Sequence, residues 1–226
     1  IGDGAFEGCH RLTSVTMQNG VTSIGADVFC YSYKLKSITI PDSVTYVGKD
    51  AFLETAWYKA QPDGVVYAGK SLYKYKGTMP TNTRIAVKQG TVSICDSAFS
   101  NYDGLTGITI PNSVTSIGSY AFSKCGNLEN VVLPDGITEM KKGVFSNCTG
   151  LLSITIPSGV TEIGKSAFYY CRNLESVYVS DLAAWMKIRF ADSDSNPLHT
   201  GATLYVKGKA ASELVIPDGV TSIPSE

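Results

Sequence analysis

The sequence has no long apolar run and no excess of charge of either sign. Because no stretch of about 18 consecutive apolar residues occurs, we expect no insertion of this chain into a membrane. Its 19 Lys and Arg residues are balanced by 20 Asp and Glu residues, for a formal net charge of -1. A chain with so little net charge generates no long-range field that attracts nucleic acid, so nucleic acid is not expected as a partner.

Histidine is also scarce, which weighs against catalysis. The two histidines, His10 and His199, lie near opposite ends of the sequence, too far apart in a stacked fold to share one site. His10 follows Cys9, but adjacent residues on a helical turn point in different directions, so they form no nucleophile–base pair. We therefore expect no catalytic residues.

The chain is instead rich in internal repetition. A unit of 23 residues returns with the pattern Ile-Gly-x-x-Ala-Phe-x-x-Cys-x-x-Leu-x-Ser-Ile-Thr-Ile-Pro-x-x-Val-Thr-x. Its phenylalanine marks the register, with successive spacings of 23, 23, 47, 23, 23 and 23 residues, at Phe6, Phe29, Phe52, Phe99, Phe122, Phe145 and Phe168. Repetition at a fixed period of this length indicates a solenoid of stacked units. We expect the phenylalanines to line up in a column.

Each unit combines a helical and an extended pattern. Phe122, Cys125 and Leu128 are apolar residues spaced by three, which predicts a short helical turn with one inward face. Residues 153–156, Ser-Ile-Thr-Ile, alternate with a period of two, as in a strand buried on one side. Proline, which has no N–H for a further ladder bond, ends the strand. A glycine such as Gly118 then permits a sharp return into the next turn.

A single unit is too small to bury its own apolar residues, so neighbours must share one continuous core. The pattern predicts an α/β repeat with one parallel β-sheet face and short helical turns opposite. Strand segments are expected around Val15, Ile38, Ala86, Ile108, Val131, Ile154, Val177 and Val215. Because both ends of the sequence fall within a unit, we expect residues 1–226 to form a single solenoid domain that belongs to a longer array.

Two segments, at about residues 53–83 and 180–212, interrupt the pattern. Each holds a tryptophan, Trp57 or Trp185, in a short helical segment, followed by strand-forming residues and a glycine turn. This order predicts a helix and then a β-hairpin in both inserts. Since loops inserted on a rigid scaffold often carry function, both are candidate binding elements.

Residues 117–139 and 163–179 resemble the repeat of the BspA-like leucine-rich repeat family, which carries Ile-Gly-x-x-Ala-Phe-x-x-Cys followed by Leu-x-x-Ile-x-Ile-Pro. The resemblance covers most of the chain. It implies a right-handed leucine-rich repeat solenoid without catalytic residues, from a bacterial surface or secreted protein associated with adhesion. Two departures affect the local turn geometry: Ser32 takes the cysteine position of its unit, and Cys95 replaces a glycine.

Six cysteines raise the question of disulfide bonds. Cys125, Cys148 and Cys171 are one repeat apart in an inward-facing position, where cysteine serves as a small apolar residue. Stacked units would bring neighbouring Cα atoms to about 5 Å, within disulfide range, so bridging remains an alternative. The sequence contains no Cys-x-x-Cys pair, and we expect no zinc site.

Residues 192–196, Asp-Ser-Asp-Ser-Asn, have the alternating oxygen ligands that begin a calcium-binding loop. Pro197 stands where such a loop needs glycine, and Thr203 stands where it needs a bidentate glutamate. A polar turn is therefore favoured, and no metal or other cofactor is expected.

The outward positions of the predicted sheet form a surface rich in Ser and Thr side chains. One interpretation is simple β-propensity and solubility. The other is a surface that hydrogen-bonds a protein or glycan, with aromatic side chains as anchors. The candidate binding residues are Ser153, Thr155, Ser176, Tyr178, Asn130, Val132, Thr109, Trp57, Trp185, Tyr73 and Tyr205.

These observations favour a non-enzymatic, adhesin-like binding module that is extracellular or at the cell surface. Its expected partner is a protein or glycan of a host or neighbouring cell, bound by a monomer. Two alternatives stay open: a structural spacer that presents another domain, and a glycan-processing or peptidase enzyme. Burial of Trp57 and Trp185 would favour the spacer, whereas carboxylates converging in a cleft would favour the enzyme.

Overall fold

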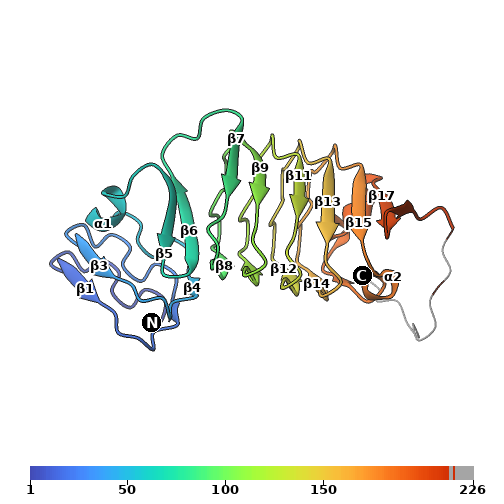
Figure 1. The fold of residues 1–226 in the computed structure, drawn as a ribbon. Helices are drawn as coiled ribbons and strands as arrows, with labels where there is room; N and C mark the ends of the chain where they lie inside the picture. The colour runs from blue at the N-terminus through green and yellow to red at the C-terminus, as the bar shows by residue number, and fades with distance from the viewer. Residues whose placement is uncertain (214–215, 217–226) are drawn as a thin grey trace.

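The computed structural model describes residues 1–213 and 216, and in it the chain winds as an elongated β-solenoid (Figure 1). The solenoid expected from the 23-residue repeat is confirmed. One long side is built from these strands: β1 (Ser14–Thr16), β3 (Ser37–Thr39), β7 (Thr83–Ala86), β9 (Leu105–Thr109), β11 (Asn130–Val132), β13 (Ser153–Ile156), β15 (Ser176–Val179) and β17 (Thr203–Val206). A second side carries two-residue strands: β2 (Ser23–Ile24), β4 (Tyr46–Val47), β8 (Ser93–Ile94), β10 (Ser116–Ile117), β12 (Glu139–Met140), β14 (Glu162–Ile163) and β16 (Arg189–Phe190).

The other elements lie in the two irregular segments. The first contains α1 (Ala56–Lys59), β5 (Gly64–Ala68) and β6 (Ser71–Lys76). The second contains α2 (Leu182–Trp185), the 3-10 helices η1 (Ser193–Ser195) and η2 (Pro197–Thr200), and β18 (Lys209–Ala210). None of the helices in the described part of the chain has the length and apolarity that crossing a bilayer requires.

Strands of successive coils pair in parallel, whereas β5–β6 and β17–β18 are antiparallel pairs. On the long side, seven strands form one sheet in the order β18-β17-β15-β13-β11-β9-β7, and β1 pairs with β3 separately. On the second side the orders are β2-β4, β10-β8-β6-β5 and β12-β14-β16. The register advances by one repeat per coil, so that Ile154 lies beside Val177. Between β15 and β17 the step lengthens, and Val177 lies beside Leu204.

The phenylalanines of the later coils stack inside the solenoid. Phe99 and Phe122 have ring centroids 5.6 Å apart, and their planes differ by 4°. The next two steps, to Phe145 and then to Phe168, are 5.4 and 5.9 Å. Each of the four rings is at most 2% exposed, so the predicted column is confirmed. Aromatic pairs at such separations add about 0.5–1.5 kcal/mol each beyond the area that they bury.

The core is divided, contrary to the expectation of one continuous interior. Buried apolar side chains form one cluster that reaches from Met17 to Tyr73 and includes Cys95, and another that reaches from Leu72 to Leu204. The division lies at the β5–β6 hairpin, which sits between β3 and β7 in Figure 1. Because β6 pairs with β8 but not with β4, the hairpin ends the first run of coils and begins the second.

The turns that contain the phenylalanines are not α-helical, which corrects the prediction of short helical turns. In an α-helix the backbone N–H groups of these phenylalanines would donate hydrogen bonds within their own coil. Instead, Phe122 N donates to Val144 O of the next coil at 3.0 Å. On either side, Tyr120 and Lys124 adopt positive φ values of 57° and 58°. This left-handed backbone costs about 1–2 kcal/mol per non-glycine residue. Hydrogen bonds between coils offset that cost, because they satisfy buried backbone groups.

The glycine that follows the two-residue strand allows close approach of neighbouring coils, and not the sharp backbone return predicted from the sequence. Gly118 has no positive φ, and a Cβ at this position would lie 2.3 Å from Asp96 Oδ1 and 2.4 Å from Asp96 N. A Cβ at Gly164 would lie 2.8 Å from Lys142 N. Any side chain here would therefore push two coils apart.

The second irregular segment is largely a lengthened coil. Because β16 pairs with β14 and β17 pairs with β15, residues between β15 and β17 complete one further turn of the solenoid. Its extra residues form η1 and η2, where the earlier coils have the phenylalanine turn. The strand expected around Val215 lies outside the described residues.

Candidate binding surface

The outward side of the seven-stranded sheet, named the outer face below, presents two rows of side chains. Parallel pairing aligns the first row as Arg84, Gly107, Asn130, Ser153, Ser176 and Thr203. It aligns the second row as Ala86, Thr109, Val132, Thr155, Tyr178 and Tyr205. The residues between the rows, such as Val131 and Ile154, point into the core. A register slip of one residue would expose that core, so burial fixes which side chains face outward.

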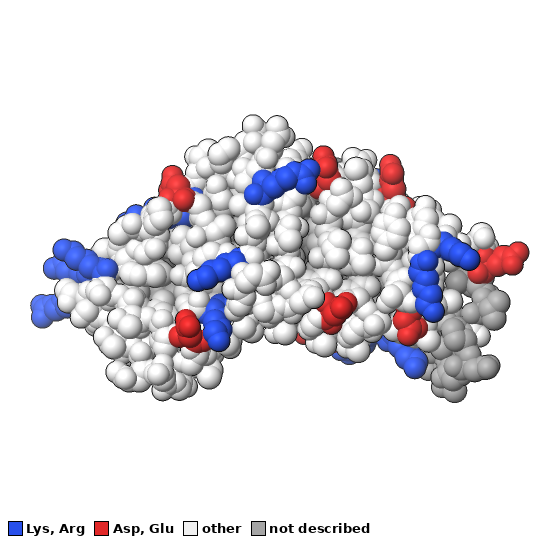
Figure 2. Space-filling model, in the orientation of Figure 1, with Lys and Arg blue, Asp and Glu red and all other residues white. Residues whose placement is uncertain are grey.

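The centre of the outer face carries little charge. Figure 2 views this side and shows Lys, Arg, Asp and Glu side chains mainly at its upper and lower rims, with uncharged side chains over β9 to β15. Val132 is 65% exposed and offers an apolar contact in the middle of the polar rows. Ser153 Oγ donates to Asn130 Oδ1 at 2.7 Å, which holds two side chains of the first row in place. The surface suits short-range hydrogen bonding and apolar contact better than attraction of a charged ligand.

Two tyrosines form an aromatic pair near the β17 edge of the outer face. The rings of Tyr178 and Tyr205 have centroids 4.9 Å apart and planes inclined by 29°. Both side chains are half-buried, so part of each ring remains available. A rigid pair of this kind offers a broad contact at low conformational cost, because the stacking already restricts both rings.

Two shallow hollows lie at the other end of the outer face. The larger, about 380 Å³, is bordered by Thr109, Asn130 and Val132, among others. The smaller, about 120 Å³, shares Thr109 and Asn130 and is also bordered by Arg84 and Gly107. It exists because Gly107 has no side chain: a Cβ there would come within 3.1 Å of Arg84 Nη1.

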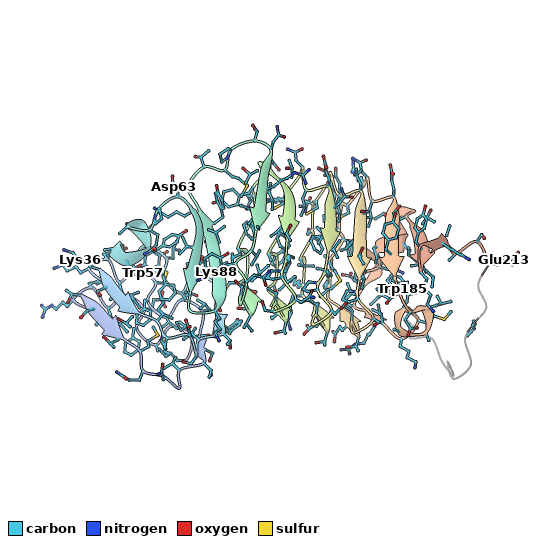
Figure 3. All side chains as sticks on the ribbon, viewed as in Figure 1. Lys36, Trp57, Asp63, Lys88, Trp185 and Glu213 are labelled. Atoms are coloured by element: carbon cyan, nitrogen blue, oxygen red, sulfur yellow. The ribbon has the colours of Figure 1, made fainter. Side chains whose placement is uncertain are left out.

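Most of the residues predicted from the sequence meet on this face. The sheet brings together Thr109, Asn130, Val132, Ser153, Thr155, Ser176, Tyr178 and Tyr205. Trp57 lies apart from them on α1, half-buried, with its ring 4.8 Å from that of Phe52 (Figure 3). The hollows were not predicted, and the signal that could have located one of them is the glycine at position 107.

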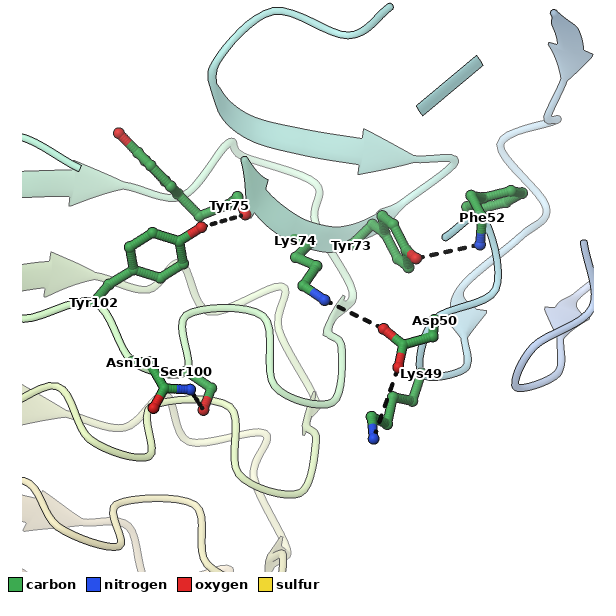
Figure 4. A network of polar contacts seen from close by, with 9 residues as sticks. All are labelled: Lys49, Asp50, Phe52, Tyr73, Lys74, Tyr75, Ser100, Asn101 and Tyr102. Atoms are coloured by element: carbon green, nitrogen blue, oxygen red, sulfur yellow. Dashed lines mark hydrogen bonds and ion pairs between the residues drawn. The ribbon is translucent and has the colours of Figure 1, made fainter. Parts of the chain in front are cut away.

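Trp185 and Tyr73 were wrongly assigned as surface anchors. Trp185 is 8% exposed, because α2 turns its ring into the core. There its ring centroid lies 5.5 Å from that of Phe190. Tyr73 is 2% exposed and lies on the inward side of β6. Its hydroxyl accepts a hydrogen bond from Phe52 N at 3.2 Å (Figure 4), and burial raises its pKa. Both aromatic side chains fill space in the core and therefore leave the candidate surface.

The cysteines form a ladder of hydrogen-bond donors inside the turns. Sγ atoms of Cys125, Cys148 and Cys171 each lie 3.0–3.1 Å from the carbonyl oxygen of the phenylalanine in the preceding coil. All six cysteines are free thiols. Burial raises the pKa of Cys125 and of Cys171 to about 12, so they remain protonated donors at neutral pH. A thiol held in this state is a poor nucleophile.

The remaining polar candidates serve local structure. Nδ1 of His10 lies 3.1 Å from Tyr31 O in the first coils, whereas His199 lies on η2 in the last described coil, so the two rings do not meet. The carboxylate of Asp192 accepts hydrogen bonds from Ser166 N, which ties η1 to the preceding coil. Across residues 1–213 no group of three His, Cys, Asp or Glu side chains is arranged to hold a metal ion.

Comparison with solved structures shows the same architecture. A leucine rich cell surface protein from Faecalibacterium prausnitzii is 26% identical, with a TM-score of 0.50, and the match covers 83% of this chain and 65% of that one. A leucine-rich repeat protein from Eubacterium ventriosum is 24% identical, with a TM-score of 0.50, and the match covers 84% of this chain and 56% of that one. This chain therefore spans less than two thirds of either neighbour.

Comparison with sequences identifies the repeat itself. No curated protein matches the chain. The BspA type leucine rich repeat region, in contrast, matches residues 1–77 and 69–195 in six copies. These ranges take in the coils on both sides of the hairpin and five strands of the seven-stranded sheet, β7, β9, β11, β13 and β15. The chain belongs to the BspA-type leucine-rich repeat family.

Proposed function

We propose that this chain is a non-enzymatic, adhesin-like binding module that recognises a protein or a glycan through its outer face. The observation that carries the proposal is the composition of that face: aligned Ser, Thr and Asn side chains, few charges, and the stacked Tyr178–Tyr205 pair at one end. Hydroxyl and amide groups both donate and accept hydrogen bonds. Sugar hydroxyls and peptide groups are complementary to them.

The proposed location is outside the cell or on its surface, and the proposed partner is a surface protein or glycan of a host or neighbouring cell. The F. prausnitzii neighbour, described as a cell surface protein, supports this location. In this proposal the module acts as a monomer. Its binding would depend weakly on salt, since the centre of the face carries so little charge.

The proposal assigns no catalytic role. Catalysis requires titratable groups that converge in one cleft, and His10 and His199 lie in different coils. The thiols of Cys125, Cys148 and Cys171 are buried and protonated. The side chains that border the outer-face hollows are mostly uncharged.

A structural spacer is the second candidate. The burial of Trp185, at 8% exposure, favours it, since a spacer needs fewer exposed aromatic anchors than a binding module. Trp57 is half-buried on α1 and faces Phe52. The Tyr178–Tyr205 pair distinguishes the candidates, because a spacer has no use for a half-buried aromatic pair that presents part of each ring on an uncharged face.

Binding of the purified chain to an array of defined glycans and extracellular-matrix proteins tests the proposal. We expect retention on at least one array component, lowered about tenfold when Tyr178 and Tyr205 are both replaced by Ala, as for the loss of an aromatic anchor. Tyr46→Ala, a change at an exposed tyrosine on the second side of the solenoid, serves as the matched control and should bind normally. Retention by no component, or equal retention by all variants, would favour the spacer.

A further inference from the structure

A third hollow lies on the turn side of the solenoid, away from the outer face. Its volume is about 300 Å³, at the lower end of the range for ligand pockets, about 300–1,000 Å³. One wall is the turn at residues 168–172, and the other is formed by η1 and η2 one coil later. The binding function proposed for the outer face does not use this hollow.

The hollow arises where the pairing of coils stops. In the preceding coil, Asn147 N donates to Tyr169 O at 2.7 Å, and the equivalent bond recurs along the stack. One coil later, Phe168 N still donates to Asp194 O at 2.9 Å, but Tyr170 N has no hydrogen bond to any described residue. The lengthened coil has replaced the usual turn by η1 and η2. A backbone donor that the repeat normally satisfies is therefore left at the edge of the hollow.

Side chains in the hollow also have unused hydrogen-bonding capacity. The Asp194 carboxylate takes part in none of the ion pairs of the described chain and in none of its side-chain hydrogen bonds. Asn196 accepts a hydrogen bond from Leu198 N through Oδ1, which leaves its Nδ2 as a donor. The ring of His199 is exposed on η2. The hollow thus combines a strong acceptor, the Asp194 carboxylate, with two donors that the described residues leave free, the Asn196 amide and the backbone N–H of Tyr170.

Two tyrosines, Tyr169 and Tyr170, border the hollow. A cation covers one face of the Tyr170 ring, and no cation of the described residues covers the Tyr169 ring. Tyr169 and Tyr170 are 45% and 41% exposed, with ring centroids 5.9 Å apart. The guanidinium of Arg172 lies 3.5 Å from the centroid of the Tyr170 ring and covers one of its faces. Tyr169 therefore remains as an apolar platform. The charges of Arg172 and Asp194, which line the same hollow, balance each other.

The geometry points to a binding site for one neutral sugar residue of a glycan in this hollow. Neighbouring sugar hydroxyls donate and accept at once, so they match the carboxylate of Asp194 and the amide of Asn196. The C–H face of the sugar ring stacks on Tyr169. A phosphate fits poorly because Asp194 repels it, and a cation fits poorly because Arg172 repels it and already covers Tyr170.

Titration of the purified chain with glucose, galactose, mannose and N-acetylglucosamine, each followed by saturation-transfer NMR and calorimetry, tests this site. We expect saturable binding of at least one sugar, with a dissociation constant of about 1 mM. Tyr169→Ala and Asp194→Asn should each weaken it by about tenfold. Tyr169→Phe should bind as the wild type does, because the stacking ring remains. Asp194→Asn keeps the shape of the side chain, so its effect does not depend on misfolding.

Two controls separate this site from the outer face and from an anion site. Tyr46→Ala, a change at an exposed tyrosine on the second side of the solenoid, should leave the sugar titration unchanged. Array retention of the Tyr178 and Tyr205 double variant is measured separately, so the proposed function and this site can fail separately. Saturable binding of none of the four sugars would overturn the inference, as would equal affinity in the wild type, Tyr169→Ala and Asp194→Asn. Binding of inorganic phosphate that tightens in Asp194→Asn would also overturn it, in favour of an anion site.

Discussion

The regular stack from β8 to β15 and the region beside the β5–β6 hairpin both place a side-chain hydrogen-bond donor against a backbone carbonyl oxygen of the preceding coil. They use different residues for it. In the regular stack, Cys125 Sγ donates to Phe99 O of the preceding coil at 3.0 Å. Where the first coil of this stack meets the hairpin, Tyr102 occupies the cysteine position, and its hydroxyl donates to Tyr75 O of β6 at 3.0 Å. In the second coil, Ser32 takes the same role. The comparison teaches that the repeat preserves a hydrogen-bond donor at this position, and that the residue type can change.

The two regions differ in what they preserve of the sheets. The regular stack continues the long sheet from coil to coil, whereas its two-residue strands fall into two groups, β10-β8 and β12-β14-β16. The hairpin continues only the second side, where Leu72 of β6 pairs with Ile94 of β8, and leaves β3 and β7 in separate sheets. Tyr73 and Tyr75 then occupy the interval between Phe52 and Phe99, each with its ring near one of them. The insertion therefore interrupts one sheet and divides the core, while one of its tyrosine rings packs near the phenylalanine on each side of the division.

The largest expected difference in the free energy of unfolding is between removing a phenylalanine ring in the middle of a column and removing one in the first coil. Phe145→Ala removes a fully buried ring that stacks on both neighbours at 5.4 and 5.9 Å. We expect a loss of about 3–5 kcal/mol in the free energy of unfolding. Phe6→Ala removes a ring that is 44% exposed and stacks on one neighbour, and should cost clearly less. Urea unfolding followed by circular dichroism measures both, and equal losses would contradict the stacked-column account.

The sequence predicted those features of the fold that repeat without change. The spacing of Phe99, Phe122, Phe145 and Phe168 was enough to predict the column, since identical residues at a constant interval must occupy equivalent positions. The turns were mispredicted because apolar spacing of three is shared by a helical turn and by a left-handed turn. Only the pairing of backbone groups between coils distinguishes them, and a single unit of sequence does not contain that information.

The candidate site was predictable only where strand alternation settles the orientation of a side chain. Alternation correctly placed Thr155 and Tyr178 on the outer face beside their neighbours. Tyr73 was predicted as an anchor because it is a tyrosine of an insert, and this was wrong, because β6 belongs to the second side, where Tyr73 packs against Phe52. The turn-side hollow at Tyr169 depends on a lengthened coil, and the repeat pattern does not indicate how such a coil packs.

Replacing a glycine tests whether close approach of coils limits the regular stack. Gly118→Ala places a Cβ 2.4 Å from Asp96 N, a backbone atom, and we expect a loss of about 1–3 kcal/mol from the forced shift of one coil. Gly2 occupies the same repeat position, but a Cβ added there would have no other atom within 4 Å. Gly2→Ala is therefore the matched control and should be nearly neutral in thermal unfolding. Similar losses in the two variants would contradict close approach of coils as the reason for the glycine, because a Cβ at Gly2 meets no other coil.

An effect of similar size should distinguish the loss of a buried hydrogen bond at the hairpin from the loss of an exposed one. Tyr73→Phe removes the acceptor of Phe52 N and leaves that N–H unpaired in the core, at an expected cost of about 1–3 kcal/mol. Tyr67→Phe removes the acceptor of Lys88 N, which lies at the surface where water replaces it. We expect little change for this control in urea unfolding. If both variants lost the same stability, the Tyr73 hydroxyl would have no special role in joining the hairpin to the first run of coils.

The smallest effect concerns the protonation of the cysteine ladder. Burial raises the pKa of Cys125 from 9.0 to about 12, so above pH 9 the thiol ionises in the unfolded chain while the folded chain keeps it protonated. The unfolded state then binds fewer protons, and stability falls as pH rises from 9 towards 12, by about 1.4 kcal/mol per pH unit for each such thiol. Cys125→Ser should keep the donor to Phe99 O, as Ser32 does in its own coil, and should remove this share of the slope. Urea unfolding at pH 8, 9 and 10 compares the variant with the wild type, and parallel pH profiles would show that the Cys125 thiol is not protected from ionisation by the stack.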